Sequence, residues 1–456
     1  MRCYTTDGRG AFRHTDRAFH RDERAEMGLV VCRPDKTYQR IVGFGGAFTE
    51  AAASVFAQMP PDVQDDFLLQ CFGRAPEVHA GQGGNAYTLC RTHIQSCDFA
   101  LGNYAYVRPF DRALQTFSIS RDQQLLLPFI KCGLAVNPHF QLFASPWSPP
   151  AFMKTNRRMN GGGRLRHSCY EAWANLLVRY VDAYAREGVR IGRMSIQNEP
   201  MACQTWDSCL FTAEEEAEFA AHFLRPALDA AGYEDVVLFA WDHNTDRILE
   251  RVEATFAYPD ADAAFGGCAL HWYAGDHFEQ VRAVAEAYPN KELLFTEGCV
   301  EYSLDQAKEA TQERKAEQYA HAVIGHLNAG AHGFIDWNLL LDERGGPNHV
   351  GNFCEAPLMY DRAAQQLIVN RSFHYLGHFS RFVVPGSQRF LTSRFTDDIE
   401  CVGFVRPDST RVLVILNRRA HEARLSVAER PWVARVEVPA HSIVTLTWDS
   451  NEVCAP

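Results

Sequence analysis

Long apolar runs, blocks of basic residues and paired cysteine motifs are all missing from this sequence. It carries 45 Lys and Arg against 56 Asp and Glu, a formal net charge of -11, and its basic residues form no block. This balance excludes recruitment of nucleic acid or anionic membrane through bulk charge. No apolar run approaches the roughly 20 residues of a membrane span, so we expect no stable membrane insertion.

A signal peptide and a metal-binding framework are missing as well. The segment from Met1 to Asp7 has no apolar core, so we expect a cytoplasmic protein, although a mature form without its leader would look the same. The 14 cysteines lie singly from Cys3 to Cys454, with no Cys-x-x-Cys pair and no Cys/His ligand spacing. This pattern favours buried thiols over a zinc site or a disulfide framework, and we expect no metal and no cofactor.

What the sequence does contain is 46% apolar residues in 456 positions, which is ample for a large core. From Arg40 onward, apolar strand-like runs alternate with amphipathic helical patterns, which is typical of βα units around a parallel sheet. Eight strands with helices between them predict an α/β fold of the (β/α)₈ TIM-barrel type. The strands are expected at residues 40–48, 86–94, 140–146, 191–197, 236–241, 268–273, 292–296 and 333–339.

An open, doubly wound sheet with a nucleotide site is the main rival to the barrel. Such a sheet normally carries a glycine-rich phosphate loop after its first strand. Residues 43–48 read Gly-Phe-Gly-Gly-Ala-Phe and fail the Gly-x-Gly-x-x-Gly pattern, because Phe48 occupies the third glycine position. We therefore favour the barrel.

The pattern changes after a helix that we expect near residues 363–379. Short alternating strands separated by turn residues then predict a small all-β sandwich. Strand-like pieces before residue 38 are too few to fold alone, so we expect them to complete this sandwich from the other end of the chain. The predicted organisation is N-terminal sandwich strands in 1–38, the catalytic barrel in 39–380 and the remaining sandwich in 381–456.

Two of the predicted strands end in a carboxylate. Residues 194–200 read Met-Ser-Ile-Gln-Asn-Glu-Pro, and Pro200 prevents further ladder pairing directly after Glu199. Glu297 closes a second strand in the same way. Because active sites of (β/α)₈ barrels lie at the C-terminal ends of the strands, we expect both glutamates in one pocket, as acid and base or acid and nucleophile. Glu50 is a spare carboxylate that could equally cap a helix.

Aromatic and hydrogen-bonding side chains occur around the same predicted rim. Aromatic rings stack on the CH face of a pyranose, while Asp, Asn and Arg bind sugar hydroxyls in directed pairs. A rim of this composition suits a neutral sugar. The residues at or just past the predicted strand ends are Arg91, Asp98, Trp147, His271, Trp272, Tyr273, Trp337 and Asn338.

Several of these residues stand in segments that resemble glycoside hydrolase family 30, in the branch of acid β-glucosidase (glucosylceramidase). The order and spacing of the likeness are kept from residue 41 to residue 353. The segments are Arg-Thr-His-Ile-Gln-Ser-Cys-Asp-Phe at 91–99, Ala-Ser-Pro-Trp-Ser-Pro-Pro-Ala-Phe-Met-Lys-Thr-Asn at 144–156, Gln-Asn-Glu-Pro at 197–200, Phe-Thr-Glu-Gly-Cys at 295–299 and Asp-Trp-Asn-Leu at 336–339.

The resemblance implies a retaining β-glycosidase with a β-sandwich packed on its barrel. It implies that Glu199 is the general acid/base, that Glu297 is the nucleophile and that Asn198 binds the sugar 2-hydroxyl. We expect Arg91 to keep Glu297 ionised, and the charge of Glu297 to raise the pKa of Glu199 so that Glu199 holds a proton. The candidate substrate-binding residues are Arg91, Asp98, Trp147, Asn198, His271, Tyr273, Trp337 and Asn352.

The sequence indicates a β-glycoside as substrate but does not identify which one. Asp98 favours a hexose with free 4- and 6-hydroxyls, so we expect a small β-glucoside or a glycolipid, and a covalent glycosyl-enzyme intermediate. β-1,6-Glucanase and β-xylosidase or β-fucosidase activities on the same scaffold are the alternatives. A non-catalytic sugar-binding protein is disfavoured by the presence of both glutamates. A metal-dependent hydrolase with His93, His243 and His271 as ligands is a further alternative, but the sequence shows no metal-ligand spacing that supports it.

Overall fold

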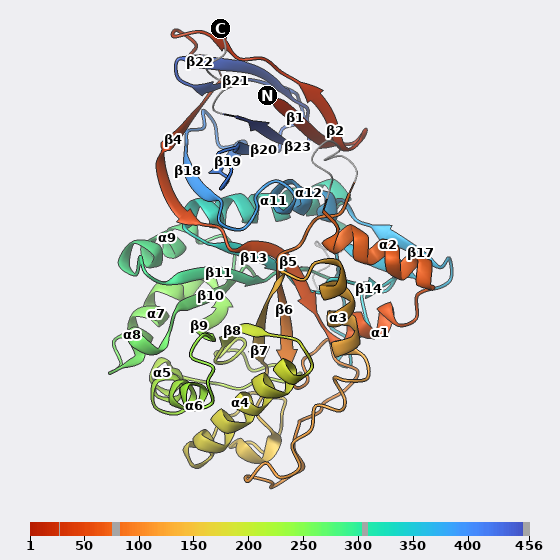
Figure 1. Ribbon diagram of the computed structural model, residues 1–456, viewed down its shortest axis with the longest axis vertical. Coiled ribbons are helices and arrows are strands. Elements are labelled where there is room, and N and C mark those ends of the chain that lie inside the picture. Colours follow the sequence, from red (N-terminus) through yellow and green to blue (C-terminus); the bar gives the residue numbers. More distant parts are fainter. Residues whose placement is uncertain (27, 75–82, 303–308, 450–456) are drawn as a thin grey trace.

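The computed structural model describes residues 1–26, 28–74, 83–302 and 309–449. Figure 1 shows a barrel with helices around it in one half of the molecule and a layered β-structure in the other, where both chain ends lie. The barrel is closed by eight parallel strands in the order β10-β11-β13-β5-β6-β7-β8-β9. They are β5 (Gly43–Phe48), β6 (Leu89–Ile94), β7 (Gln141–Pro146), β8 (Ile191–Ser195), β9 (Val237–Asn244), β10 (Gly267–His271), β11 (Glu292–Glu297) and β13 (Gly333–Asp336).

Each of the eight predicted strands overlaps one barrel strand, which confirms the predicted fold class. Apolar side chains fill the inside of the barrel, as the fold requires. The rings of Phe143 and Phe239 meet there edge to face, 5.1 Å between centroids. A Cβ on Gly45 would stand 2.0 Å from the carbonyl oxygen of Leu89, so only glycine lets β5 approach β6 this closely.

Helices surround the barrel and bury one face against it. In α4 (Tyr170–Arg186) the apolar face is buried, including Leu176, Leu177 and Tyr180. The helices are α1 (Glu50–Phe56), α2 (Pro61–Phe72), α3 (Leu126–Val136), α4 (Tyr170–Arg186), α5 (Ala213–Phe219), the π-turn η3 (Ala220–Leu224), α6 (Arg225–Ala230), α7 (Ile248–Phe256), α8 (Ala261–Ala264), α9 (Phe278–Ala287), α11 (Gln312–Ala329) and α12 (Arg371–Ser380), with 3-10 turns η1 (Ala151–Met153), η2 (His167–Cys169) and η4 (Thr245–Arg247). None of the helices that the structure describes is long and apolar enough to cross a membrane.

The helix expected near residues 363–379 starts later than predicted. Residues Gln366–Val369 form β17, which pairs with β16 (Leu358–Asp361) as a hairpin. The carboxylate of Asp361 accepts hydrogen bonds from the backbone of Ala363 and Ala364 (2.9 Å each), which closes the turn. Short strands also pair above the barrel: β14 (Leu341–Asp342) with β16, and β12 (Val300–Glu301) with β15 (Cys354–Glu355).

The sandwich is built from both ends of the chain. Its strand order is β2-β1-β23-β20-β19-β18-β4-β21-β22-β3, so the N-terminal strands enter at three separate places. The strands are β1 (Arg2–Asp7), β2 (Gly10–Asp16), β3 (His20–Arg21), β4 (Leu29–Arg40), β18 (Gln388–Thr392), β19 (Ile399–Val405), β20 (Arg411–Asn417), β21 (Ala423–Glu429), β22 (Trp432–Val438) and β23 (Ser442–Trp448).

Helix α12 joins this sandwich to the barrel. The ring nitrogens of His378 on α12 lie 2.7 Å from the hydroxyl of Thr6 on β1 and 2.8 Å from that of Thr445 on β23. Phe12 stacks on the same imidazole at 4.7 Å. One buried histidine therefore holds both chain ends against the barrel.

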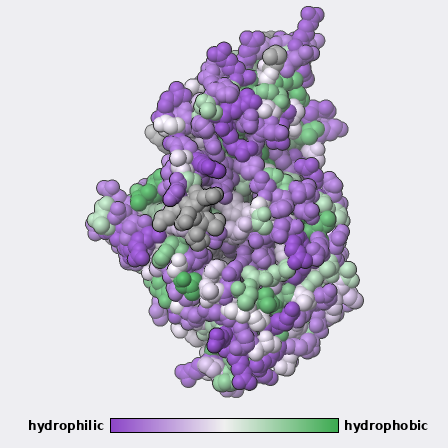
Figure 2. All heavy atoms as spheres, turned by 180° about the vertical axis from the view of Figure 1, so that it is seen from behind, coloured by the Kyte–Doolittle hydropathy of each residue, from purple (hydrophilic) through white to green (hydrophobic). Residues whose placement is uncertain are grey.

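The surface seen from the opposite side is mostly hydrophilic. Among the residues drawn in colour in Figure 2, apolar side chains lie in several separate patches. This agrees with the excess of acidic over basic residues and the net charge of -11.

We expect the sandwich core to contribute strongly to stability. Leu413 on β20 is fully buried in that core, so Leu413→Ala should lower the free energy of unfolding by about 2–5 kcal/mol. Ile368→Ala is the control, because Ile368 is 39% exposed and its loss should change stability by about 0.5 kcal/mol. Urea unfolding followed by tryptophan fluorescence measures both; equal effects would contradict the assignment of this core.

Candidate active site

Glu199 stands just beyond the C-terminal end of β8, in a strained backbone conformation. Its φ of 48° lies in the left-handed region, which non-glycine residues rarely adopt. Its backbone N–H donates to the carbonyl of Asp242 (3.0 Å), and the N–H of Asn198 donates to the carbonyl of Pro146 (2.8 Å). The chain after β8 is thereby tied to the ends of both neighbouring strands, and strain of this kind is common at functional sites.

Glu297 is the last residue of β11 and faces Glu199. A carboxylate oxygen of Glu297 lies within 4.8 Å of one from Glu199. Tyr273 donates its hydroxyl hydrogen to Glu297 (3.1 Å), and the guanidinium of Arg91 forms an ion pair with the other oxygen. In retaining glycosidases the two carboxyl groups are about 5–5.5 Å apart, against about 6.5–9.5 Å in inverting ones. The observed spacing belongs with the retaining class.

Arg91 is fully buried below this pair and connects most of the site. Besides Glu297, its guanidinium donates to the side-chain oxygens of Asn198 and Asp242 (2.8 Å each) and to the hydroxyl of Ser145 (3.1 Å). These contacts fix the amide of Asn198 and leave the charge of Arg91 shared between two carboxylates. Arg91 was expected to contact the sugar, but it lies behind the cavity wall.

Asp242, which follows from no motif identified in the sequence, is the second centre of the network. It lies at a bulge two residues before the end of β9, with φ of 49°, and accepts hydrogen bonds from the hydroxyls of Ser195 and Thr296 (2.6 Å each) as well as from Arg91. Burial opposes its ionisation, but Arg91 and His271 together hold the pKa of Asp242 far below its ordinary value. The only available signal was its place at the end of the fifth predicted strand.

His271 bridges Asp242 and Glu199. Its Nε2 lies 3.0 Å from Asp242 Oδ1 and its Nδ1 lies 3.2 Å from Glu199 Oε1. Burial alone would lower the pKa of His271, but the negative charge of Glu297 and the two hydrogen-bonded carboxylates raise it to about 9. His271 is therefore cationic at neutral pH, and it lies behind Glu199 with no exposed side-chain surface.

The contacts reverse the expected order of the two glutamate pKa values. Burial opposes ionisation of Glu199, but the hydrogen bond from His271 and the nearby His243 lower its pKa. Burial also raises the pKa of Glu297, an effect that His271 and Arg91 oppose and the charge of Glu199 reinforces. The sequence could not reveal this, because the cation that decides it comes from a separate strand.

Above the carboxylates lies a cavity of about 170 Å³. The indoles of Trp147 and Trp337 stack at 5.2 Å on one side of the site, and Arg91 lies 4.8 Å from the Trp147 ring. Asp98 accepts from the amide of Asn352 (3.5 Å), and burial raises its pKa well above the ordinary range. Of the predicted residues, the cavity is lined by Asp98, Trp147, Asn198, Glu199, Tyr273, Glu297, Trp337 and Asn352; it is also lined by Gln204, Trp206, His243, Asn244, Cys299, Glu301 and Cys354, which were not predicted.

Two other rim residues and the spare carboxylate Glu50 have structural contacts instead. Trp272 packs in the core against Phe295 and Tyr319 (5.8 and 4.9 Å between ring centroids). Asn338 accepts a hydrogen bond from the hydroxyl of Thr49 (2.7 Å). The spare carboxylate of Glu50 pairs with Arg121 (2.7 Å), so its role is to hold a loop.

Metal binding can be tested against the same geometry. Within the described ranges, only Glu199, His271 and Glu297 bring three metal-ligand atoms together. Both nitrogens of His271 already contact carboxylates and Arg91 already pairs with Glu297, so a cation here would face two positive charges. The three histidines of the metal-hydrolase alternative do not converge, because His93 accepts from the backbone of Glu50 (3.0 Å).

Comparison with known proteins agrees with this geometry. Residues 41–383 match the glycosyl hydrolase family 30 TIM-barrel domain, and residues 386–446 match the family 30 β-sandwich domain. The chain belongs to glycosyl hydrolase family 30. It is therefore a glycoside hydrolase that acts with retention of configuration, and the predicted family resemblance is confirmed.

Relatives of this family 30 chain include enzymes named for different activities. It is 34% identical over 439 residues to the lysosomal acid glucosylceramidase of Mus musculus, covering 92% of this chain and 83% of that protein. It is 26% identical over 419 residues to an endo-1,6-β-D-glucanase of Neurospora crassa, covering 86% and 82%. Among solved structures, SrfJ from Salmonella typhimurium shares 42% identity with a TM-score of 0.93, covering 98% and 99%.

We expect glycosidase activity to be independent of metal ions. Incubation with EDTA followed by gel filtration should leave the rate of aryl β-glycoside hydrolysis unchanged, because Arg91 and His271 supply the positive charge of the site. Loss of activity that returns only when a divalent cation is added back would contradict this prediction.

Proposed function

We propose that this family 30 hydrolase cleaves β-glucosides, with Glu199 as general acid/base and Glu297 as nucleophile. The observation that carries the proposal is the pair of carboxylates within 4.8 Å of each other on the wall of one small cavity. Arg91 and Tyr273 hold Glu297 in place. Both roles come from geometry together with the family resemblance.

The shape of the cavity supports a single terminal glucose as the bound sugar. Its volume of about 170 Å³ is below the roughly 300–1,000 Å³ of pockets for drug-sized ligands, so it suits one ring. Trp147 and Trp337 offer aromatic faces, and Asp98 offers a carboxylate for the 4- and 6-hydroxyls. Asn198, oriented by Arg91, is placed to bind the 2-hydroxyl beside Glu297.

In the first step Glu297 attacks the anomeric carbon while Glu199 gives a proton to the glycosidic oxygen. The C–O bond to the leaving group breaks, the aglycone departs as an alcohol, and a glycosyl ester forms on Glu297. The pKa of His271 is raised to about 9, whereas that of Glu199 is lowered. The proton for the leaving group is therefore carried by His271 in the resting enzyme. It passes to Glu199 across the 3.2 Å hydrogen bond.

In the second step the roles reverse. Esterification removes the negative charge of Glu297, and Glu199 then takes a proton from water as that water attacks the anomeric carbon. Tyr273 and Arg91 remain beside the ester oxygens and stabilise the carboxylate as it leaves. β-Glucose is released with its configuration retained, and the proton taken from water returns from Glu199 to His271 across the same hydrogen bond, which restores the resting enzyme.

A second groove, next to the sugar cavity, is the candidate binding site for the leaving group. It has a volume of about 780 Å³ and shares Gln204 with the sugar cavity. Asn103, Asn160 and Thr205 also line it, so it can hydrogen-bond the hydroxyls of a second sugar. This favours gluco-oligosaccharides and makes β-1,6-glucanase activity the second candidate. A glycolipid such as glucosylceramide is supported by the glucosylceramidase relative and by Met201, which is 42% exposed two residues after Glu199.

A substrate panel tests the glycone. Aryl β-D-glucoside should be hydrolysed with a higher kcat/KM than the xyloside, fucoside or galactoside, because Asp98 lines the cavity and is expected to bind a 6-hydroxyl, which the xyloside and fucoside lack, and an equatorial 4-hydroxyl, which is axial in the galactoside. Gentio-oligosaccharides and glucosylceramide in the same panel separate the two aglycone classes. A preference for the xyloside would overturn the β-glucosidase proposal.

Labelling with a 2-deoxy-2-fluoro β-glucoside tests which residue is the nucleophile. Mass spectrometry should place the label on Glu297, and Glu297→Gln should lower kcat by about a thousandfold or more. Glu301→Gln is the control, since Glu301 also lines the cavity and lies four residues away. A label on Glu301 would refute the assignment.

The proton on His271 predicts a pH dependence. Because the pKa of His271 is raised to about 9, its protonated form is present below that pH and is lost as the pH rises through it. We expect kcat/KM to fall above about pH 9 and the fall to move to lower pH in His271→Gln, where Glu199 must hold the proton itself. His243→Gln is the comparison variant: His243 lies 3.8 Å from the same oxygen of Glu199, but burial lowers its pKa, so its removal should move the alkaline limb less. An unchanged alkaline limb in His271→Gln would exclude this role.

A further inference from the structure

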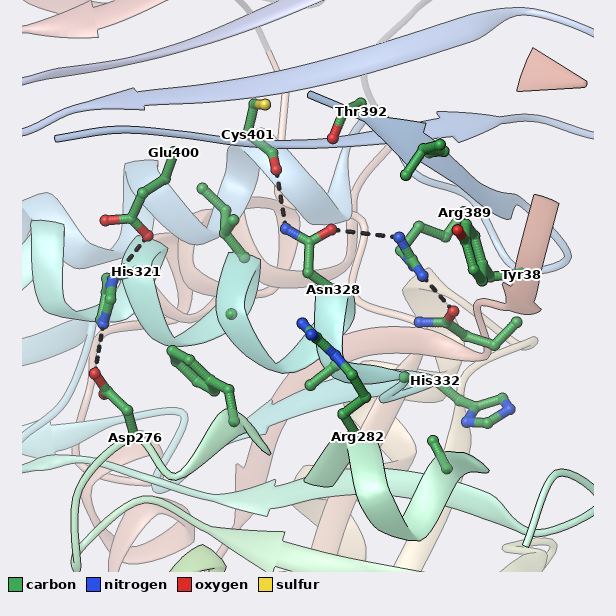
Figure 3. Close-up of a pocket in the computed structure, with 18 of the residues that line it drawn as sticks. Tyr38, Asp276, Arg282, His321, Asn328, His332, Arg389, Thr392, Glu400 and Cys401 are labelled. Carbon is green, nitrogen blue, oxygen red and sulfur yellow. Dashed lines mark hydrogen bonds and ion pairs between the residues drawn. The ribbon is translucent and has the colours of Figure 1, made fainter. Parts of the chain in front are cut away.

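A large cleft separates the barrel helices from the sandwich, away from the sugar cavity. It has a volume of about 1010 Å³ and is lined by α9 and α11 on the barrel side and by β18 and β19 on the sandwich side (Figure 3). Tyr38, Lys291 and His332, which precede β5, β11 and β13, lie along it. These residues mark the N-terminal face of the barrel, opposite the active site.

The charges at one end of the cleft are balanced. His321 on α11 lies 2.7 Å from a carboxylate oxygen of Glu400 and 2.9 Å from one of Asp276. Arg418 adds a further contact to Glu400 (2.7 Å). Despite burial, these partners raise the pKa of His321 to about 9. This end is a closed set of ion pairs and offers little to a ligand.

The other end of the cleft holds two arginines without a counter-ion. Among the residues that the structure describes, no carboxylate oxygen lies within 4.0 Å of a side-chain nitrogen of Arg389 or Arg282, although Glu286 stands one turn after Arg282 on α9. Figure 3 shows Arg282 reaching from α9 toward Asn328 and Arg389. Two positive charges thus face the same part of the cleft.

Arg389 is the more unusual of the two, because it is only 7% exposed. Its guanidinium donates to the side-chain oxygens of Gln39 (3.1 Å) and Asn328 (3.5 Å) and lies 3.8 Å from the ring of Tyr38. These neutral partners orient the guanidinium but do not neutralise its positive charge. Burial and the charge of Arg282 lower the pKa of Arg389 to about 10, so it is still protonated at neutral pH.

We propose that this end of the cleft binds an oxyanion, a phosphate or carboxylate group carried on a small organic molecule. A buried charge without a partner is unfavourable, and an anion between Arg389 and Arg282 would relieve it. Guanidinium groups match the planar donor geometry that phosphate and carboxylate require. The cleft is far larger than an inorganic ion, and Tyr38 and Leu391 provide apolar surface for an organic body.

The test is isothermal titration calorimetry of the full chain at constant ionic strength. The probes are sn-glycerol 3-phosphate, glycerate, inorganic phosphate and glycerol, which differ in the anionic group and in the organic body. We expect saturable binding of at least one of the two organic anions and none of glycerol. Binding of the ester but not of inorganic phosphate would show that the organic body is needed, and equal binding would assign the site to the free oxyanion.

Variants test whether the anion binds in the cleft. Arg282→Gln should weaken binding by about tenfold or more, the effect expected for a charge-assisted hydrogen bond. Arg314→Gln, an exposed arginine of α11 outside the cleft, should leave binding unchanged. Arg389→Lys should also weaken it; if that variant fails to fold, the exposed Arg282 decides alone. Absence of saturable binding by the unmodified chain, or equal affinity in Arg282→Gln, would overturn the proposal.

Discussion

The ion pairs of Arg91 are the interaction on which the active site depends. A fully buried guanidinium lies between Asp242 and Glu297 and also orients Asn198. Buried charges are unfavourable unless they are paired and hydrogen-bonded. Removing one partner would therefore leave another charge unpaired in the low-dielectric interior. Because Asp242 in turn holds His271, the protonation state of Glu199 is tied to the same network.

The barrel supplies the positions that this network needs. Parallel strands bring residues that are far apart in sequence to one rim, and the backbone there is left-handed at Glu199, Asp242 and Asn338. Each such residue costs about 1–3 kcal/mol of strain, which the surrounding hydrogen bonds and packing offset. Rigid strands below and strained turns above fix the two carboxylates at the spacing that retention requires.

The sandwich gives the molecule a second functional face. Strands from both chain ends pair in one sheet, and His378 anchors that sheet to the barrel. Where β18 and β19 approach α9 and α11, the surfaces do not close, and the cleft with Arg389 and Arg282 remains. Glycoside cleavage and anion binding would therefore occur at opposite faces of the barrel, without sharing side chains.

The barrel strands, the sandwich and the two glutamates could all be predicted from the sequence. Strand periodicity and turn residues act locally, and a carboxylate at a strand end is visible in a motif such as Asn198-Glu199-Pro200. The folded structure was needed to show which rim residues line the cavity, that Glu50 pairs with Arg121, and that Asp242 and His271 are the partners that act on the charge of Glu199. The reason is physical: a pKa depends on charges and burial contributed by other strands, and those distances exist only once the barrel has closed.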